Sequence, residues 1–204
     1  MPGGKNPWIR EGFQRNCISR GIKQASDDDL IIISDLDEIP NPKLIVNFNS
    51  SMKYAVFKQK HFYYKINLHS QKNPFWLGSR ICVKKYLKSP QWLRELKFKK
   101  RPFWRLDKLR LNNILESGGW HFCNLKNAEE LLYKYRNLCE TNDSFIFNES
   151  IDQKYLDLES IKKKISSGED IIGRNDSFKK IRIDNSFPKY ILKNIPLYKD
   201  WIAN

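Results

Sequence analysis

The hydrophobic and polar positions of this chain follow two different periods, which predicts both helices and strands. Between Trp8 and Arg20 three apolar residues recur four positions apart, the spacing of one helix face. After an aspartate-rich turn, Leu30 to Ser34 form a short and almost continuous apolar run, typical of a strand buried on both faces. A helix that leads into such a strand predicts a layered α/β sheet, which usually binds ligands beyond the carboxyl ends of its strands.

Later segments continue this mixture of strands and helices. Residues 53–68, 76–87 and 117–125 are rich in β-formers and predict further strands. Asn127, with Glu130 three residues later, predicts the N-cap of one helix, and Gly168 is suited to end a longer helix that starts near Asn148. The sequence has no internal repeat and no clear linker, so we expect a single domain over residues 1–204.

Three acidic residues stand directly after the apolar run, in the stretch "SDLDEIP". Asp35, Asp37 and Glu38 bring three negative charges to one predicted strand end, in a chain with a net charge of +14. A single carboxylate would be enough to cap a helix, so an N-cap alone does not account for three. A metal site or a phosphatase-like aspartate pair are the other interpretations.

The metal interpretation accounts best for the number of acids. Like charges this close raise the pKa of at least one carboxyl group unless a cation offsets them. Carboxylates are hard ligands, and they favour Mg²⁺ or Mn²⁺ over zinc. Four widely spaced cysteines form no CxxC pair, which also argues against a zinc site.

Composition limits the class of protein without defining its function. Apolar residues make up 40% and charged residues 29% of the 204 residues, as in globular proteins. No apolar run approaches the ~20 residues that span a bilayer, and no signal peptide is recognisable, so a cytoplasmic location is the default. The positive charge favours anionic partners. It does not by itself predict specific binding to nucleic acid.

Several stretches, in order, resemble glycosyltransferase family 17. The specific one is "SDLDEIP" with the upstream "QR" of "REGFQRNCISRGI". The likeness continues through "FYYKINL", "WLGSRICV", "SGGWHFCNL", "ISSGEDIIGR" and "FPKYILKN", and so covers nearly the whole chain. This family includes the β-1,4-mannosyl-glycoprotein 4-β-N-acetylglucosaminyltransferases.

The resemblance implies a GT-A-like α/β fold, with a Rossmann-type nucleotide-sugar-binding sheet and flanking helices. It also implies an inverting transfer of N-acetylglucosamine from UDP-N-acetylglucosamine to a β-mannose-like glycan or glycoprotein acceptor, as in N-glycan processing. Family members usually have a further N-terminal portion with the first strands of the sheet. The chain is therefore expected to be an N-terminally short catalytic domain.

The resemblance and the chemistry of the side chains together suggest roles for individual residues. The metal ligands are expected to be Asp35, Asp37 and Glu38, joined by His121 by analogy with other GT-A enzymes. An inverting transfer needs a base that takes the proton of the acceptor hydroxyl, and the candidates are Asp170 and Glu169. Donor binding is assigned to Gln14, Arg15, Asp35, Arg174 and Trp120, while Trp76 and Arg80 are candidates to line the cleft.

Three alternatives remain at this point. A haloacid-dehalogenase-type phosphatase needs a D-x-D-x-[TV] motif and a later acid pair after an aliphatic strand, and the sequence has no such second pair. A non-enzymatic nucleic-acid-binding module would use basic segments with aromatic residues, such as 97–105. A truncated and inactive glycosyltransferase would keep the acidic motif but lack part of the nucleotide-binding half.

Overall fold

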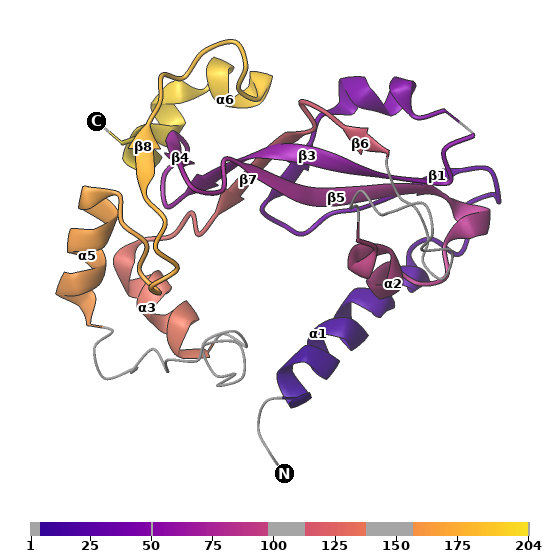
Figure 1. The fold of residues 1–204 in the computed structure, drawn as a ribbon, viewed down its shortest axis with the longest axis horizontal. Helices are drawn as coiled ribbons and strands as arrows, with labels where there is room; N and C mark the ends of the chain where they lie inside the picture. The colour runs from indigo at the N-terminus through magenta and orange to yellow at the C-terminus, as the bar shows by residue number, and fades with distance from the viewer. Residues whose placement is uncertain (1–4, 50, 98–112, 138–156, 204) are drawn as a thin grey trace, which may run out of the picture. The chain divides into compact units, whose positions relative to one another are not determined.

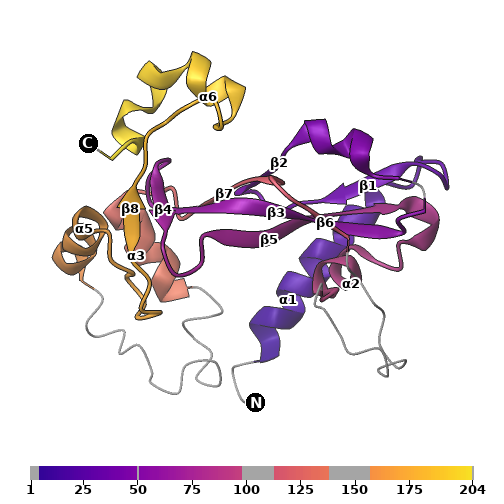
Figure 2. The same cartoon turned by 45° about the horizontal axis from the view of Figure 1, so that its top comes forward.

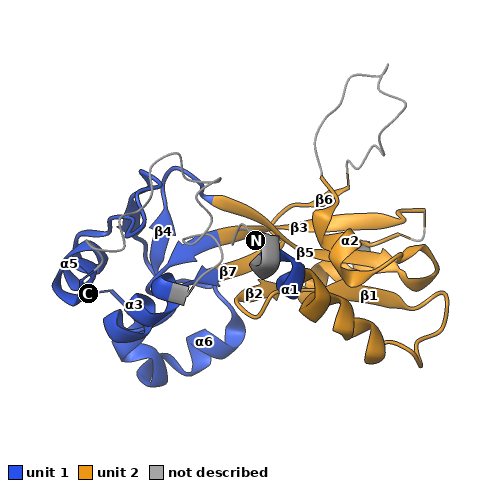
Figure 3. Ribbon diagram, turned by 90° about the horizontal axis from the view of Figure 1, so that it is seen from below, with its two compact units in different colours: residues 1–11, 61–74, 122–204 blue, residues 12–60, 75–121 orange. Residues whose placement is uncertain are grey.

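A computed structural model describes residues 5–49, 51–97, 113–137 and 157–203 (Figure 1). The basic segment 97–105 lies almost wholly outside these residues, as does the predicted helix start at Asn148. The chain divides into two compact units, unit 1 with residues 1–11, 61–74 and 122–204, and unit 2 with residues 12–60 and 75–121 (Figure 3). One helix and two strands contribute residues to both units. The single catalytic domain over residues 1–204 stays a prediction.

Unit 2 contains antiparallel strands that run side by side in Figure 1. Strand β1 pairs with β5, and β5 pairs with β3, both antiparallel, while β6 runs parallel to β3. A short strand β2 pairs antiparallel with β7. The bounds are β1 Leu30–Ile33, β2 Glu38–Pro40, β3 Tyr54–Tyr63, β5 Phe75–Val83, β6 Ile114–Leu115 and β7 Gly119–Cys123.

Helical segments of unit 2 are short. Helix α1 spans Lys5–Asn16 and continues as a 3-10 helix, so the predicted N-terminal helix is confirmed. Helix α2 spans Pro90–Glu95, where the Ser89 side chain accepts a hydrogen bond from the backbone N–H of Trp92 as an N-cap. The 3-10 helices are Cys17–Arg20, Pro42–Asn47 and Lys84–Tyr86.

Strand β1 differs from the expectation of a strand buried on both faces. Ile31 and Ile33 are buried, whereas Leu30 is 40% exposed and Ile32 is half-buried. On one face Ile32 packs only at the margin of a core that includes Phe48 and Phe57, and Leu30 is the first residue of the strand. The other face packs into a core with Val56 and the α2 residue Leu93. The unbroken apolar run therefore indicated a strand correctly but overestimated its burial.

Unit 1 is built around a second sheet segment covered by helices. Strand β4 (Leu68–Ser70) lies between the end of β3 and β8 (Phe178–Lys180), antiparallel to both. Helices α3 (Ala128–Asn137) and α5 (Leu158–Ser167) lie next to each other beside β8 (Figure 2). The chain closes with α6 (Lys189–Lys193) and a 3-10 helix Ile195–Trp201.

The helix ends of unit 1 confirm the predicted capping. Asn127 accepts from the backbone N–H of Glu130 at 2.8 Å, and Glu130 accepts from the backbone N–H of Asn127 at 3.1 Å. This reciprocal pair is a capping box. Gly168 ends α5 in the left-handed region with a φ of 69°, a conformation that favours glycine.

Candidate functional site

The acidic motif forms a tight turn between β1 and β2. The backbone N–H of Glu38 donates to the carbonyl of Asp35 at 3.1 Å, and the backbone N–H of Asp35 donates to Glu38 Oε2 at 3.1 Å. Asp35 and Glu38 are thus the two ends of the turn. Leu36 and Asp37 occupy its middle, and Leu36 is fully exposed.

Arg94, on α2, holds both ends of this turn. Its Nη2 lies 2.6 Å from Asp35 Oδ2 and 2.9 Å from Glu38 Oε1, and its Nη1 lies 3.0 Å from Glu38 Oε2. The Arg94 side chain is only 9% exposed. Such forked, charge-assisted hydrogen bonds are short and fix orientation as well as charge. No local pattern in the sequence singles out Arg94.

Glu38 is buried in a set of hydrogen bonds that leaves it little freedom. Besides Arg94, the indole Nε1 of Trp76 donates to it at 2.8 Å and the hydroxyl of Ser79 lies 3.4 Å from Oε2. Gln59 in turn donates to the Ser79 hydroxyl at 3.1 Å. Glu38 therefore anchors the turn to β5. The predicted role of Glu38 as a metal ligand stays a prediction.

Arginines supply the positive charge that the acidic cluster requires. Arg15 Nη2 lies 3.2 Å from Asp35 Oδ1, while its Nη1 donates to Gln91 at 2.6 Å. Arg80 is buried on β5, where burial and the neighbouring Arg94 lower its pKa to about 10, still well above neutral pH. Arginines of unit 2 thus balance much of the negative charge for which the sequence predicted a bound cation.

Asp37 faces a histidine. Its Oδ2 is 3.3 Å from His121 Nε2, and its side chain is 35% exposed. His121 sits opposite Glu38 in the β2–β7 register, and its ring lies 5.2 Å from that of Trp76. The site therefore combines a half-exposed carboxylate with a buried imidazole.

Asp37 and His121 together offer donor atoms that suit one divalent cation, and the full predicted ligand set of Asp35, Asp37, Glu38 and His121 stays a prediction. The Asp37 carboxylate suits Mg²⁺ or Mn²⁺, and His121 adds a nitrogen donor. The remaining positions would be open to water and to the oxygens of a diphosphate, as such cations prefer. Asp35 and Glu38 already direct their oxygens to arginine.

The other predicted donor-binding residues are distributed over both units. In unit 2, Gln14 is exposed on α1 and the half-buried Trp120 pairs with Ile39 across β7 and β2. In unit 1, Arg174 is exposed and its Nη1 lies 3.4 Å from the hydroxyl of Tyr63. Their contribution to donor binding stays a prediction.

The two candidate bases lie in unit 1, next to each other in sequence but in different surroundings. Asp170 is buried and accepts a hydrogen bond from the backbone N–H of Arg174, which closes the turn after α5. Glu169 is exposed and its backbone forms an isolated bridge to Ser177. A role for either as the catalytic base stays a prediction.

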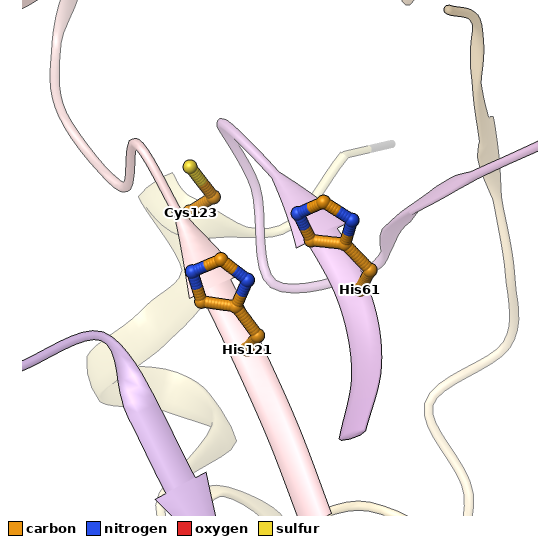
Figure 4. A group of neighbouring side chains, drawn as sticks. All are labelled: His61, His121 and Cys123. Atoms are coloured by element: carbon orange, nitrogen blue, oxygen red, sulfur yellow. The ribbon is translucent and has the colours of Figure 1, made fainter. Parts of the chain in front are cut away.

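Figure 4 shows His61 on β3 and His121 and Cys123 on β7, three residues whose side chains carry atoms that can ligate a metal. His61 and Cys123 belong to unit 1, and His121 is the last residue of unit 2. The acidic site described above consists of unit 2 residues alone.

Comparison with known families identifies the class of the protein. The model of glycosyltransferase family 17 matches residues 1–181. The chain belongs to glycosyltransferase family 17, and its activity is accordingly glycosyl transfer from a nucleotide sugar to a glycan acceptor. Searches of curated proteins and of solved structures gave no significant match. Among the described residues, no helix combines the length and hydropathy needed to cross a membrane.

Proposed function

We propose that this protein is a metal-dependent, inverting glycosyltransferase that transfers N-acetylglucosamine from UDP-N-acetylglucosamine to a β-mannose-like glycan acceptor. The observation that carries the proposal is the half-exposed Asp37 carboxylate beside the buried His121, in a chain of this family. The mixed α/β structure is consistent with a GT-A-like fold, which is part of the proposal.

Asp37 and His121 would hold Mn²⁺ or Mg²⁺. A bound divalent cation offsets the negative charge that grows on the leaving diphosphate. Asp37 supplies the carboxylate, while His121 is held against Asp37 at 3.3 Å and against the ring of Trp76. Asp37 directly precedes β2, and His121 is on β7. Because β2 and β7 are paired, they set the position of the two side chains relative to each other.

Further residues complete the proposal. Arg15, already 3.2 Å from Asp35, is placed to add positive charge near the donor phosphates, since guanidinium groups match phosphate geometry. Trp120 offers an aromatic face for a sugar ring, and Gln14 and Arg174 are further candidates for donor contacts. Asp170 and Glu169 are the proposed bases for the acceptor hydroxyl.

The first test is calorimetric titration of UDP-N-acetylglucosamine into the protein with and without Mn²⁺. We expect binding that requires Mn²⁺ and that weakens at least about tenfold in Asp37→Asn, because the amide removes the charge that attracts the cation. Asp28→Asn is the matched control, since Asp28 is an exposed acid of the same unit that pairs with Lys85.

Three results would oppose this function. Binding of UDP-N-acetylglucosamine that does not depend on Mn²⁺, or equal affinity in wild type and Asp37→Asn, would contradict the metal-dependent site. Phosphate release from phosphomonoesters would favour the phosphatase alternative. Oligonucleotide binding that falls steeply with salt, without donor binding, would favour the nucleic-acid alternative.

A further inference from the structure

We propose that Arg94 is a positioning residue of the donor site, which fixes both ends of the acidic turn and so presents Asp37 to the cation. The inference rests on the proposed function, because it presupposes a cation at Asp37. It goes further in one respect: it assigns Asp35 and Glu38 to a supporting role.

The geometry of the turn gives the first argument. Asp35 and Glu38 are the first and last of its four residues, and their carboxylates meet on the same guanidinium at 2.6 to 3.0 Å. When both ends of such a turn are fixed, its two middle residues have little freedom to move. One of them, Leu36, is fully exposed, and the other is Asp37.

The anchoring of Arg94 itself gives the second argument. Arg94 Nη1 also donates to the carbonyl of Gly78 at 2.7 Å, so that the guanidinium is tied to β5 as well as to the turn. The preceding residue, Leu93, is fully buried in the core of unit 2. A buried side chain with three separate acceptors is a rigid support.

The balance of charge at Asp35 and Glu38 gives the third argument for the positioning role of Arg94. Arg94 stands between Asp35 and Glu38, where a cation would otherwise be needed, and Arg15 also neutralises Asp35. A second positive ion at those two carboxylates would have to displace a guanidinium. The divalent cation is thus directed to Asp37, which faces His121 instead.

The experiment measures the affinity of the full chain for Mn²⁺ alone, from the paramagnetic resonance signal of free Mn²⁺, and its Mn²⁺-supported affinity for UDP-N-acetylglucosamine. Arg94→Lys keeps the positive charge but lacks the planar fork. We expect both affinities to fall by about 10- to 100-fold, the usual effect of losing a residue that orients a metal ligand. Lys85→Gln, which alters an exposed ion pair of the same unit, should leave both unchanged.

A second variant separates positioning from simple charge balance. Arg94→Gln combined with Glu38→Gln removes both members of the buried ion pair, and Asp35 keeps Arg15 as a partner, so no buried charge is left uncompensated. If Arg94 only balances charge, this double variant should bind Mn²⁺ as the wild type does. If Arg94 positions the turn, thermal unfolding should stay close to wild type while the Mn²⁺ affinity remains at least about tenfold lower.

The other possible results also decide whether Arg94 positions the acidic turn. Wild-type Mn²⁺ affinity in Arg94→Lys or in the double variant would overturn the inference and leave the proposed function standing. Failure of both variants to fold would assign Arg94 to the stability of unit 2 and contradict a specific positioning role. Absence of Mn²⁺ and donor binding in the wild type would overturn the proposed function, and the inference with it.

Discussion

At the acidic turn, side chains of opposite charge lie in close contact: Arg94 reaches both Asp35 and Glu38, and Asp37 faces His121. Asp35, Asp37 and Glu38 were recognisable in the sequence because three acids follow one apolar run. His121 was suggested by analogy with other GT-A enzymes. Arg94 was not recognisable, because an arginine near the end of a short helix has no local signature, and its partner Glu38 lies 56 residues away.

The close approach of β7 to β2 at Gly119 can be tested with a single substitution. The φ of Gly119 is +122°, and a Cβ there would lie 2.1 Å from the carbonyl oxygen of Ile39 on β2. Gly119→Ala should therefore lower the free energy of unfolding by about 1–3 kcal/mol or more, since both the backbone and the close approach resist a side chain.

Urea unfolding of Gly119→Ala measures this effect against a matched glycine. Gly21 has a φ of −77°, and its nearest contact for an added Cβ is the carbonyl oxygen of Ile18 at 3.6 Å. Gly21→Ala should cost nothing or stabilise slightly, by about 0.4–1 kcal/mol. Equal stability of the two variants would show that β2 and β7 do not approach as closely as described.

At the scale of elements, local signals predicted helix ends better than they predicted sheet pairing. The capping box at Asn127 and the stop at Gly168 depend on residues within a few positions of each other. The burial of β1 depends on its position in the sheet, which no local pattern contains. The short strand β2 lies in a segment with two prolines, which are uncommon within sheets, yet it pairs with β7.

The contribution of the N-cap residue Asp157 to the stability of α5 can be tested through its pH dependence. The backbone N–H and the hydroxyl of Ser160 donate to Asp157 at 2.8 and 2.7 Å, and these bonds hold the pKa of Asp157 below its ordinary value. A lowered pKa in the folded state means that the stabilisation is present above the unfolded-state pKa of about 3.9. It is lost as pH falls through the lower folded value.

Asp157→Asn should remove this pH dependence while keeping the cap, because asparagine is about as good an N-cap as aspartate. The measurement is the urea midpoint of both proteins between pH 7 and pH 3. The wild type should lose more stability than the variant over the acidic part of that range. Parallel curves would show that the Asp157 carboxylate contributes nothing through its charge.

At the scale of the whole molecule, the strongest evidence is the family match over residues 1–181. The net charge of +14 predicts affinity for anions in general, but part of it is used within unit 2 to balance the acidic turn. The mixed α/β class and the family could be predicted from the sequence because ordered motifs extend over most of the chain, whereas the GT-A-like fold stays a prediction. The division into two units was not, because it depends on contacts between distant segments.

The most direct test of the account is the release of UDP from UDP-N-acetylglucosamine in the presence of mannose-containing N-glycan acceptors. The assay compares wild type, Asp37→Asn and Asp28→Asn, with Mn²⁺ and with a chelator. The account predicts that chelation abolishes UDP release, that Asp37→Asn lowers its rate about 100-fold as expected for loss of charge stabilisation, and that Asp28→Asn behaves as wild type. UDP release that persists under chelation and at the wild-type rate in Asp37→Asn would contradict it.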